Sequence, residues 1–479
     1  MAFLIGGANS AADDAYEVAN SCRFNSADSP HMYKTPGSDG NRKTWTFSIW
    51  CKRSKIGVRG ELFGVYNEDN DLTESFRFNT DDTLMYEEDI AGADYEVSST
   101  RLFRDPSAWY NIVLIRDTTE STEANRVKLF INGVQDTLVE SGLGFPAEDG
   151  LSSQINQQHK HYVGSGSNTA YFFDGYLAEA VFIDGTAYAA TSFGEFDEDS
   201  PNIWKPKNVS GLTFGTNGFY LDYEDSSNLG NDANGGTDFT EANLAAVDQC
   251  VDSPTNNFCT LNPLDNQRQG FTIIEGNTQI TATPNYDFIT GTMGVSAGKW
   301  YWEKKIITIP NLEYIYDGIS DHVQWTANWD LGGEAGQYCL TRMAGKIKVA
   351  SGSETTYGGS MTTNDIQGFA LDADNNKFYI SNNGAWATGS GAWDSTTFDA
   401  AVGVITIAHA TSAIVGASDF WFPAIGNGND NMNVQVNYGN PPYTLSSAVN
   451  DENGYGNFEY APPSGFLALC TKNLGSSGG

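Results

Sequence analysis

Apolar and polar residues alternate with a period of two, and this constrains the fold of the chain more than any other feature. In residues 43–52 (KTWTFSIWCK), Trp45, Phe47, Ile49 and Cys51 fall on one face of an extended strand. The pattern predicts a β-strand with one buried face. Runs with the 3.6-residue period of a helix are nearly absent from the sequence, so we expect an all-β protein.

The same reasoning predicts strands throughout the chain. Asn132-Gly133 and Asp374-Asn375 each lie between two strand-like runs and predict tight hairpins, because such residues tolerate a positive φ. We therefore predict two tandem antiparallel β-sandwich (jelly-roll) domains joined by a packed connector. The further strands are expected at residues 109–116, 126–131, 175–184, 299–309, 366–373, 376–381, 420–425 and 433–438.

A length of 479 residues exceeds one ordinary core and fits two or three domains. We predict an N-terminal arm at 1–19, a first sandwich at 20–206 and a second sandwich at 266–445. Residues 207–265 are interpreted as the connector, because they mix prolines, glycines and asparagines with one apolar strand at 218–223. Residues 446–479 are interpreted as a C-terminal tail.

The charge of the chain excludes some partners. Lys and Arg number 26 against 60 Asp and Glu, a formal net charge of −34 that repels phosphate backbones and anionic membranes. We expect neither nucleic-acid binding nor membrane insertion. Residues 1–5 are apolar but too few for a signal peptide, and the six scattered cysteines lack the spacing of a metal site. Cys250 and Cys259 are interpreted as buried thiols.

No residue pattern predicts catalysis. The nearest match to a glycosidase carboxylate pair is the run 195–199 (EFDED), which follows the last strand of the first sandwich and is interpreted as an acidic exposed turn. None of the five histidines lies beside a nucleophile motif. We therefore predict a protein that is not an enzyme.

Calcium is the one candidate cofactor. Asn67, Asp69 and Asp71 place oxygen-bearing side chains at alternate positions, as calcium loops do, although the closing residues of an EF-hand are missing. The alternative interpretation of this run is a solvated turn.

Aromatic residues in loops are the candidate ligand contacts, because the CH-rich face of a sugar ring stacks on an aromatic ring. The alternative is that these rings fill the cores. Residues 322–330 (HVQWTANWD) combine two tryptophans with an amide and a carboxylate that can bond sugar hydroxyls. The candidate ligand-binding residues are Trp325, Asn328, Trp329, Asp330, Trp386, Trp393 and Tyr171.

Four motifs in the first predicted sandwich carry a resemblance to the laminin-G/concanavalin A-like superfamily. They are residues 44–50 (TWTFSIW), 109–116 (WYNIVLIR), 127–133 (VKLFING) and 175–183 (GYLAEAVFI). Their order and spacing match over roughly 170 residues. The resemblance implies a jelly-roll fold, and the superfamily includes glucanases as well as binding modules.

The second predicted sandwich resembles SPRY domains. The motifs are residues 298–304 (GKWYWEK), 368–380 (GFALDADNNKFYI), 422–423 (FP) and 436–439 (VNYG). The resemblance implies that partners bind through variable loops at one edge of the sandwich.

Three further motifs are residues 215–223 (GTNGFYLDY), 252–265 (DSPTNNFCTLNPLD) and 462–474 (PPSGFLALCTKNL). With the order of the two sandwiches, they resemble virion proteins of tailed phages, many of them marine, over nearly the whole chain. This resemblance implies a structural protein on the virion surface, in a tail fibre or a capsid decoration, made in the host cytoplasm without a signal peptide. It also implies a homo-oligomer that contacts other virion proteins and a host-surface glycan or protein. A purely structural capsid or tail component and a polysaccharide depolymerase are the alternatives.

Overall fold

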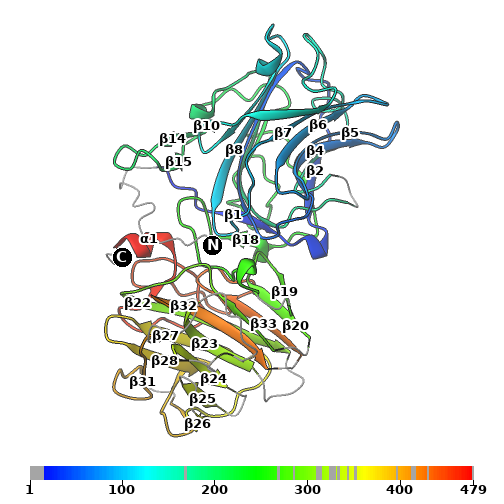
Figure 1. Ribbon diagram of the computed structural model, residues 1–479. Coiled ribbons are helices and arrows are strands. Elements are labelled where there is room, and N and C mark those ends of the chain that lie inside the picture. Colours follow the sequence, from blue (N-terminus) through cyan, green and yellow to red (C-terminus); the bar gives the residue numbers. More distant parts are fainter. Residues whose placement is uncertain are drawn as a thin grey trace. The chain divides into compact units, whose positions relative to one another are not determined.

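The structure is a computed structural model, and it divides into two compact units with the boundary between Thr255 and Asn256. We call these the N-terminal unit and the C-terminal unit; both consist mainly of strands, which confirms the all-β prediction (Figure 1). The described residues are 16–166, 170–266, 270–283, 286–308, 315–322, 331, 335–341, 345–349, 353–394, 397–410, 417–428 and 431–476. The helical elements among them are α1 (Thr471–Ser476) and the 3₁₀ turns η1 (Ser26–Asp28), η2 (Glu123–Asn125), η3 (Ala190–Ser192), η4 (Ala246–Asp248) and η5 (Pro263–Asp265).

Two antiparallel sheets form the N-terminal unit, and β14 (Gly194–Phe196) pairs separately with β15 (Trp204–Pro206). The first sheet has the order β10 (Val134–Gln135), β9 (Val127–Ile131), β8 (Trp109–Asp117), β3 (Thr44–Arg53), β13 (Gly175–Asp184), β1 (Ser21–Phe24) and β18 (Gln249–Cys250), with β16 (Phe219–Leu221) beside β13. The second sheet has the order β11 (Leu138–Gly142), β7 (Asp94–Ser99), β6 (Leu84–Asp89), β5 (Leu72–Phe78), β4 (Gly60–Asn67), β12 (His161–Val163), β2 (His31–Lys34) and β17 (Thr240–Ala242).

The core of the N-terminal unit lies between these sheets. The predicted inner face of β3 is fully buried, and Phe47 stacks on Phe63 of β4 with 4.6 Å between the ring centroids. The predicted hairpin joins β9 to β10, with a φ of 49° at Asn132 and 74° at Gly133. Burial of these rings removes much apolar area from water, which is the main favourable term in folding.

The other face of β3 corrects the expectation of a single buried face. Trp50 is only 4% exposed, because Trp109, Tyr176 and Trp204 cover it together with Val18. Part of this cover comes from chain segments that follow β13, so sequence periodicity within β3 could not show it.

The predicted connector is likewise not a separate element. Within residues 207–255, β16 pairs with β13, β17 with β2 and β18 with β1, so this stretch completes both sheets of the N-terminal unit. Residues 256–265 belong to the C-terminal unit. The composition of this stretch, with short apolar runs between glycines and asparagines, is typical of a connector. Its pairing with strands far along the chain could not be seen in that composition.

The C-terminal unit also contains two sheets, which are antiparallel except for the parallel pair β22–β34. The first has the order β19 (Phe271–Ile274), β20 (Gln279–Ala282), β33 (Met432–Asn437), β22 (Lys299–Thr308), β27 (Ile366–Asp372), β28 (Lys377–Asn382), β29 (Ala385–Ala387) and β30 (Trp393–Asp394), with β31 (Ile405–Thr406) beside β28 and β34 (Leu467–Ala468) beside β22. The second has the order β21 (Tyr286–Thr290), β32 (Ala417–Gly428), β23 (Ile315–His322), β24 (Gln337–Thr341), β25 (Lys346–Val349) and β26 (Thr355–Thr356).

The predicted C-terminal tail packs as part of the C-terminal unit through residue 476. Phe458 and Leu469 are buried, and β34 lies beside β22. The carboxylate of buried Glu303 on β22 accepts the backbone N–H groups of Glu459 (3.0 Å) and Tyr460 (2.8 Å). The hydrogen bonds from these N–H groups to Glu303 therefore anchor the tail, and the tail sequence alone did not predict them.

All six cysteines are buried and free, as the interpretation of Cys250 and Cys259 expected. Burial raises the pKa of the Cys51 and Cys470 thiols to about 12, so both are unreactive at neutral pH. Among the described residues, no helix has the length and apolar character that a membrane span requires.

Candidate functional site

The first candidate site is a pocket beside Tyr171 in the N-terminal unit, with a volume of about 470 Å³. Tyr171 was predicted as a ligand contact, and its side chain is half exposed (50%). The backbone carbonyl of Tyr171 accepts the N–H of Glu61 (3.0 Å), which fixes the loop against β4. We call this the Tyr171 pocket; it is lined by Ser26, Arg53, Lys55, Gly57, Val58, Arg59, Gly60, Phe78, Thr80, Tyr171, Phe172, Phe173 and Asp174.

Cations frame the Tyr171 pocket and are held in place by carboxylates. The Arg59 guanidinium lies 3.8 Å from the centroid of the Tyr171 ring and donates to Glu61 Oε1 (2.6 Å). Lys55 Nζ contacts Asp174 Oδ2 at 2.9 Å. Burial raises the pKa of the Glu61 carboxyl, while the neighbouring Arg59 lowers it. The pocket thus combines an exposed aromatic ring with fixed hydrogen-bond donors.

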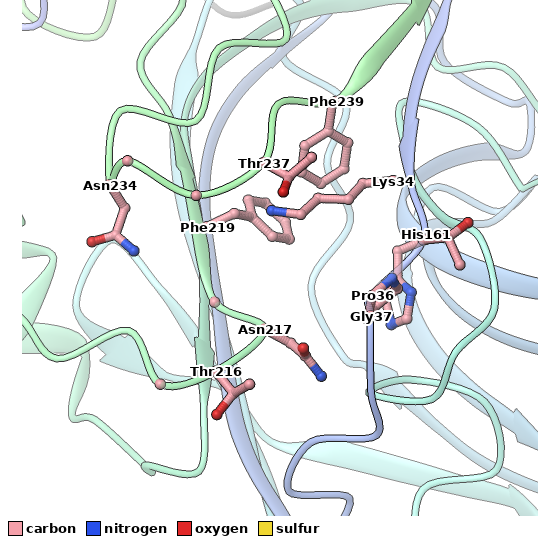
Figure 2. A pocket seen from close by; sticks show the side chains of 15 residues that line it. Lys34, Pro36, Gly37, His161, Thr216, Asn217, Phe219, Asn234, Thr237 and Phe239 are labelled. Atoms are coloured by element: carbon pink, nitrogen blue, oxygen red, sulfur yellow. The ribbon is translucent and has the colours of Figure 1, made fainter.

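A second pocket of the N-terminal unit, with a volume of about 350 Å³, was not predicted (Figure 2). Two glycine-rich loops, residues 215–218 and 234–237, form one side of it, and the end of β2 forms the other. The run NDANGGT (231–237) was the cue available in the sequence, but it lay in the supposed connector. We call this the loop pocket; it is lined by Lys34, Thr35, Pro36, Gly37, His161, Gly215, Thr216, Asn217, Gly218, Phe219, Asn234, Gly235, Gly236, Thr237 and Phe239.

The predicted calcium ligands follow the end of β4. Asn67 is buried; its Oδ1 accepts the backbone N–H of Asp69 (3.0 Å), and its Nδ2 donates to Gln154 (3.0 Å). Asp71 accepts the hydroxyl of Tyr66 (3.0 Å). These hydrogen bonds account for the loop without an ion, and no group of three or more His, Cys, Asp or Glu among the described residues is placed to hold a metal. Calcium at this loop stays a prediction.

The tryptophans of the C-terminal unit divide into two groups. Trp325, Asn328, Trp329 and Asp330 lie outside the described residues. Trp386 on β29 and Trp393 on β30 are half-buried.

Both described tryptophans have packing partners within the unit. The Trp386 ring meets Phe398 edge-on at 4.9 Å. Trp393 packs against the core, and its Nε1 donates to the carbonyl of Ser360 (3.3 Å). These contacts fit the alternative that the rings fill space, and they leave Tyr171 as the predicted aromatic residue that is half exposed beside a pocket.

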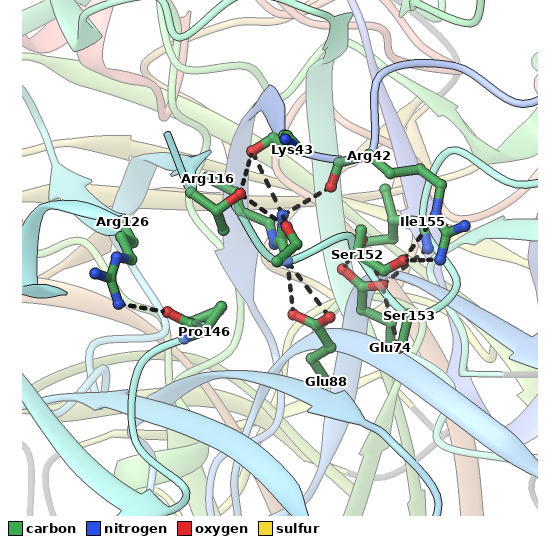
Figure 3. A network of polar contacts seen from close by, with 12 residues as sticks. Arg42, Lys43, Glu74, Glu88, Arg116, Arg126, Pro146, Ser152, Ser153 and Ile155 are labelled. Atoms are coloured by element: carbon green, nitrogen blue, oxygen red, sulfur yellow. Dashed lines mark hydrogen bonds and ion pairs between the residues drawn. The ribbon is translucent and has the colours of Figure 1, made fainter. Parts of the chain in front are cut away.

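One pair of carboxylates lies close together inside the N-terminal unit (Figure 3). Glu74 of β5 and Glu88 of β6 are cross-strand partners and are fully buried. Burial, and then the charge of Glu74, raise the pKa of Glu88 to about 7, and Arg116 opposes this rise. Both side chains are buried away from solvent, so neither is placed to contact a substrate.

The acidic run predicted as an exposed turn lies on and after β14. Glu195 is exposed and lies within 3.9 Å of Lys205 and Lys207. Asp197 accepts the backbone N–H groups of Asp199 (3.0 Å) and Ser200 (2.8 Å). These hydrogen bonds lower the pKa of the Asp197 carboxyl, the bond from Ser200 most. The run is a hydrogen-bonded turn with ion pairs to lysines.

Comparison with known proteins concerns the N-terminal unit first. Residues 28–190 match the model of Laminin_G_3, described as the concanavalin A-like lectin/glucanases superfamily. The match confirms the predicted resemblance to concanavalin A-like domains for this part of the chain. It ends before β16, so the 215–218 and 234–237 loops of the loop pocket lie outside it. No curated protein matches the chain.

Solved structures resemble parts of the chain at low identity. They include the SPRY domain of human HERC1, with 13% identity over 37% of this chain and 96% of that chain and a TM-score of 0.27. A human SPRY domain has 10% identity over 35% of this chain and 94% of that chain, with a TM-score of 0.24. A heptameric SAP-like pentraxin from Limulus polyphemus has 15% identity over 36% of this chain and 80% of that chain, with a TM-score of 0.28.

Proposed function

We propose that this protein binds glycans of a host-cell surface as a non-enzymatic component of a tailed-phage virion. The observation that carries the proposal is the Tyr171 pocket, where a half-exposed aromatic ring stands beside an open, mostly apolar recess. The concanavalin A-like match supports a binding module in the same unit.

The chemistry of the Tyr171 pocket suits a sugar ring. A pyranose offers a CH-rich face that packs on the Tyr171 ring, and its hydroxyls accept hydrogen bonds from the rim. Lys55 and Arg59 are the donors at this rim, and the adjacent carboxylates hold both in place. Few, well-placed polar groups around an apolar surface are typical of small-ligand sites.

The positions of two groups of carboxylates support binding without hydrolysis. A glycosidase needs two accessible carboxyl groups about 5–9.5 Å apart, one acting as an acid. Glu74 and Glu88 are sealed inside the core, and Glu195 is paired with lysines on an exposed turn. Neither arrangement can present an acid and a base to a glycosidic bond.

The virion assignment rests on the resemblance of the domain order to tailed-phage proteins. Binding at one open pocket is expected to be weak. Many copies on one particle would raise the overall affinity, because later contacts become intramolecular. A position on the particle surface therefore fits the modest size of the site.

A glycan array probed with the full chain tests the proposed binding. We expect binding to a limited set of glycans. Tyr171→Ala should weaken this binding at least about tenfold, because the stacking of the sugar on the ring and the accompanying hydrogen bonds contribute more than about 1 kcal/mol. Tyr95→Ala on β7 is the matched control, because it removes a partly exposed tyrosine outside every described pocket. Equal binding by Tyr171→Ala, or no binding to any glycan, would overturn the proposal.

Two further measurements separate the alternatives. Release of reducing ends from host polysaccharide would make the protein a depolymerase. Absence from purified particles in mass spectrometry would remove the virion assignment. Tight association with capsid or tail proteins without any glycan binding would instead support the purely structural component.

A further inference from the structure

The lining of the loop pocket carries little net charge. Among its lining residues Lys34 is the one ionised side chain, and its Nζ lies 3.1 Å from Oδ2 of the fully buried Asp232. His161 is uncharged, since its Nε2 accepts the backbone N–H of Asn156 (2.9 Å); burial lowers its pKa to about 4. A carboxylate, phosphate or ammonium ligand would find no free opposite charge here.

Neutral hydrogen-bonding groups surround the opening instead. Thr35, Thr216, Asn234 and Thr237 are exposed, and their side chains have no hydrogen-bond partner in the described part of the chain. Asn217 is oriented by donating from Nδ2 to the carbonyl of Ser38 (3.0 Å). Hydroxyl and amide groups both donate and accept, so they match the hydroxyls of a polyol, which also do both.

Two phenylalanine rings give the loop pocket an apolar wall (Figure 2). Phe219 and Phe239 meet edge to face with centroids 4.7 Å apart, and both are buried against the core. Lys34 Nζ lies 5.5 Å from the Phe239 ring. The rings are only 2% and 3% exposed, so they close the back of the pocket and a ligand meets mainly its polar rim.

Glycine fixes the shape of the loops. At Gly215, whose φ is 78°, a Cβ would collide with the carbonyl oxygen of Asp184, and at Gly218 with that of Phe214. At Gly236 a Cβ would collide with the carboxylate of Asp232. The loops can adopt this close approach because glycine has no side chain, and a loop fixed in advance loses less entropy on binding.

We propose that the loop pocket is a second ligand site, which binds one or two units of an uncharged saccharide. Its volume of about 350 Å³ lies in the range of small-ligand pockets. The inference shares with the proposed function the idea that the N-terminal unit recognises glycans. It concerns different residues, so the two can fail independently.

The test is calorimetric titration of the full chain with neutral methyl glycosides of glucose, galactose, mannose and N-acetylglucosamine. Glucuronate and glucosamine serve as charged comparisons. The double variant Asn234→Ala/Thr237→Val removes two exposed groups that have no structural partner, and Thr240→Val on the adjacent β17 is the matched control. We expect at least one neutral glycoside to bind at millimolar concentration, about tenfold more weakly in the double variant and unchanged in the control.

Three results would overturn the inference. They are no binding of any neutral glycoside, tighter binding of a charged sugar, and equal binding by the double variant. Tyr171→Ala distinguishes the two sites, because it should leave binding of the neutral glycoside at the loop pocket intact. If Tyr171→Ala no longer binds the glycan array but still gives binding heat with the neutral glycoside, the two pockets are separate sites.

Discussion

Arg116 in the N-terminal unit belongs to a network of buried charges, whereas Lys304 in the C-terminal unit is held in a single buried ion pair. Arg116 in the N-terminal unit is fully buried and contacts Glu88 at 3.1 Å. It also donates to the backbone carbonyls of Arg42 (2.7 Å), Lys43 (3.4 Å) and Gly150 (3.3 Å) (Figure 3). The guanidinium therefore ties two loops to the sheet besides neutralising a carboxylate.

Glu74 in the same network holds a third segment, at residues 154–155, against the sheet. Its Oε2 accepts the backbone N–H groups of Gln154 (2.8 Å) and Ile155 (2.9 Å), and its Oε1 accepts the hydroxyl of Tyr86 (2.6 Å). A buried carboxylate with several donors is well compensated for its loss of water.

The C-terminal unit contains the pair Lys304–Asp317 between its two sheets. Asp317 Oδ1 has no hydrogen-bond partner among the described residues, and the pair borders a cavity of about 10 Å³. Burial lowers the pKa of Lys304 and raises that of Asp317, each partly opposed by the other. A buried charge can therefore hold loops in place when it also bonds their backbone, as Arg116 does. It can also form a single ion pair without that role, as Lys304 does.

Removal of Arg116 should have the largest effect. Arg116→Met leaves Glu88 buried without its cation, and we expect a loss of about 4 kcal/mol in unfolding free energy. The variant also removes one donor from each of three backbone carbonyls, which keep Ser152 and Thr118 as their other donors. Urea unfolding of the full chain measures the loss. Lys128→Met, at a partly exposed cation 3.7 Å from Glu120, is the control and should change stability by less than about 0.5 kcal/mol. A small loss at Arg116 would contradict the network.

Lys304→Met should cost about 3 kcal/mol, because it leaves Asp317 as an uncompensated buried charge. The double variant Lys304→Met/Asp317→Leu should return to within about 1 kcal/mol of the parent, since neither side chain bonds another group among the described residues. The corresponding double variant Arg116→Met/Glu88→Leu should stay further below the parent, because the carbonyls of Arg42, Lys43 and Gly150 each lose one of their donors. Equal recovery in both units would break the comparison.

The dependence of stability on pH gives a further test in the N-terminal unit, with an expected effect of about 3 kcal/mol. Glu179, at a bulge in β13, accepts the hydroxyls of Tyr220 (2.8 Å) and Tyr16 (3.1 Å), and burial raises its pKa to about 7. A raised pKa contributes stability that is present below the unfolded value near 4.5 and lost as pH rises through 7. The unfolding free energy of the parent minus that of Glu179→Gln should therefore fall between pH 4.5 and 8. A flat difference would refute the shifted pKa.

Sequence periodicity predicted the strands that pass through each core, such as β3, β8 and β13, because alternation depends only on local burial. The limits of the units were not predictable in the same way. β16, β17 and β18 are two or three residues long and owe their position to pairing with strands far along the chain. The loop pocket was missed for this reason, whereas Tyr171 was found because an exposed aromatic residue in a loop needs no long-range information.

The smallest predicted effect concerns backbone strain at the binding site. Among the non-glycine residues that the structure describes with positive φ, Asn occupies four of five positions in the C-terminal unit, whereas the N-terminal unit includes Tyr171 at 61°. Tyr171→Gly should leave stability within about 1 kcal/mol of the parent, since relief of left-handed strain offsets the lost Arg59 contact and the added chain entropy. Asn376→Gly, where φ is 54° and the exposed side chain has no hydrogen-bond partner among the described residues, should change stability even less, because Asn tolerates this region. Thermal unfolding measures both. If Tyr171→Gly stays folded and loses glycan binding, the strained backbone at this position is retained for recognition. If instead the unfolding free energy falls by more than about 2 kcal/mol, the ring has a structural role.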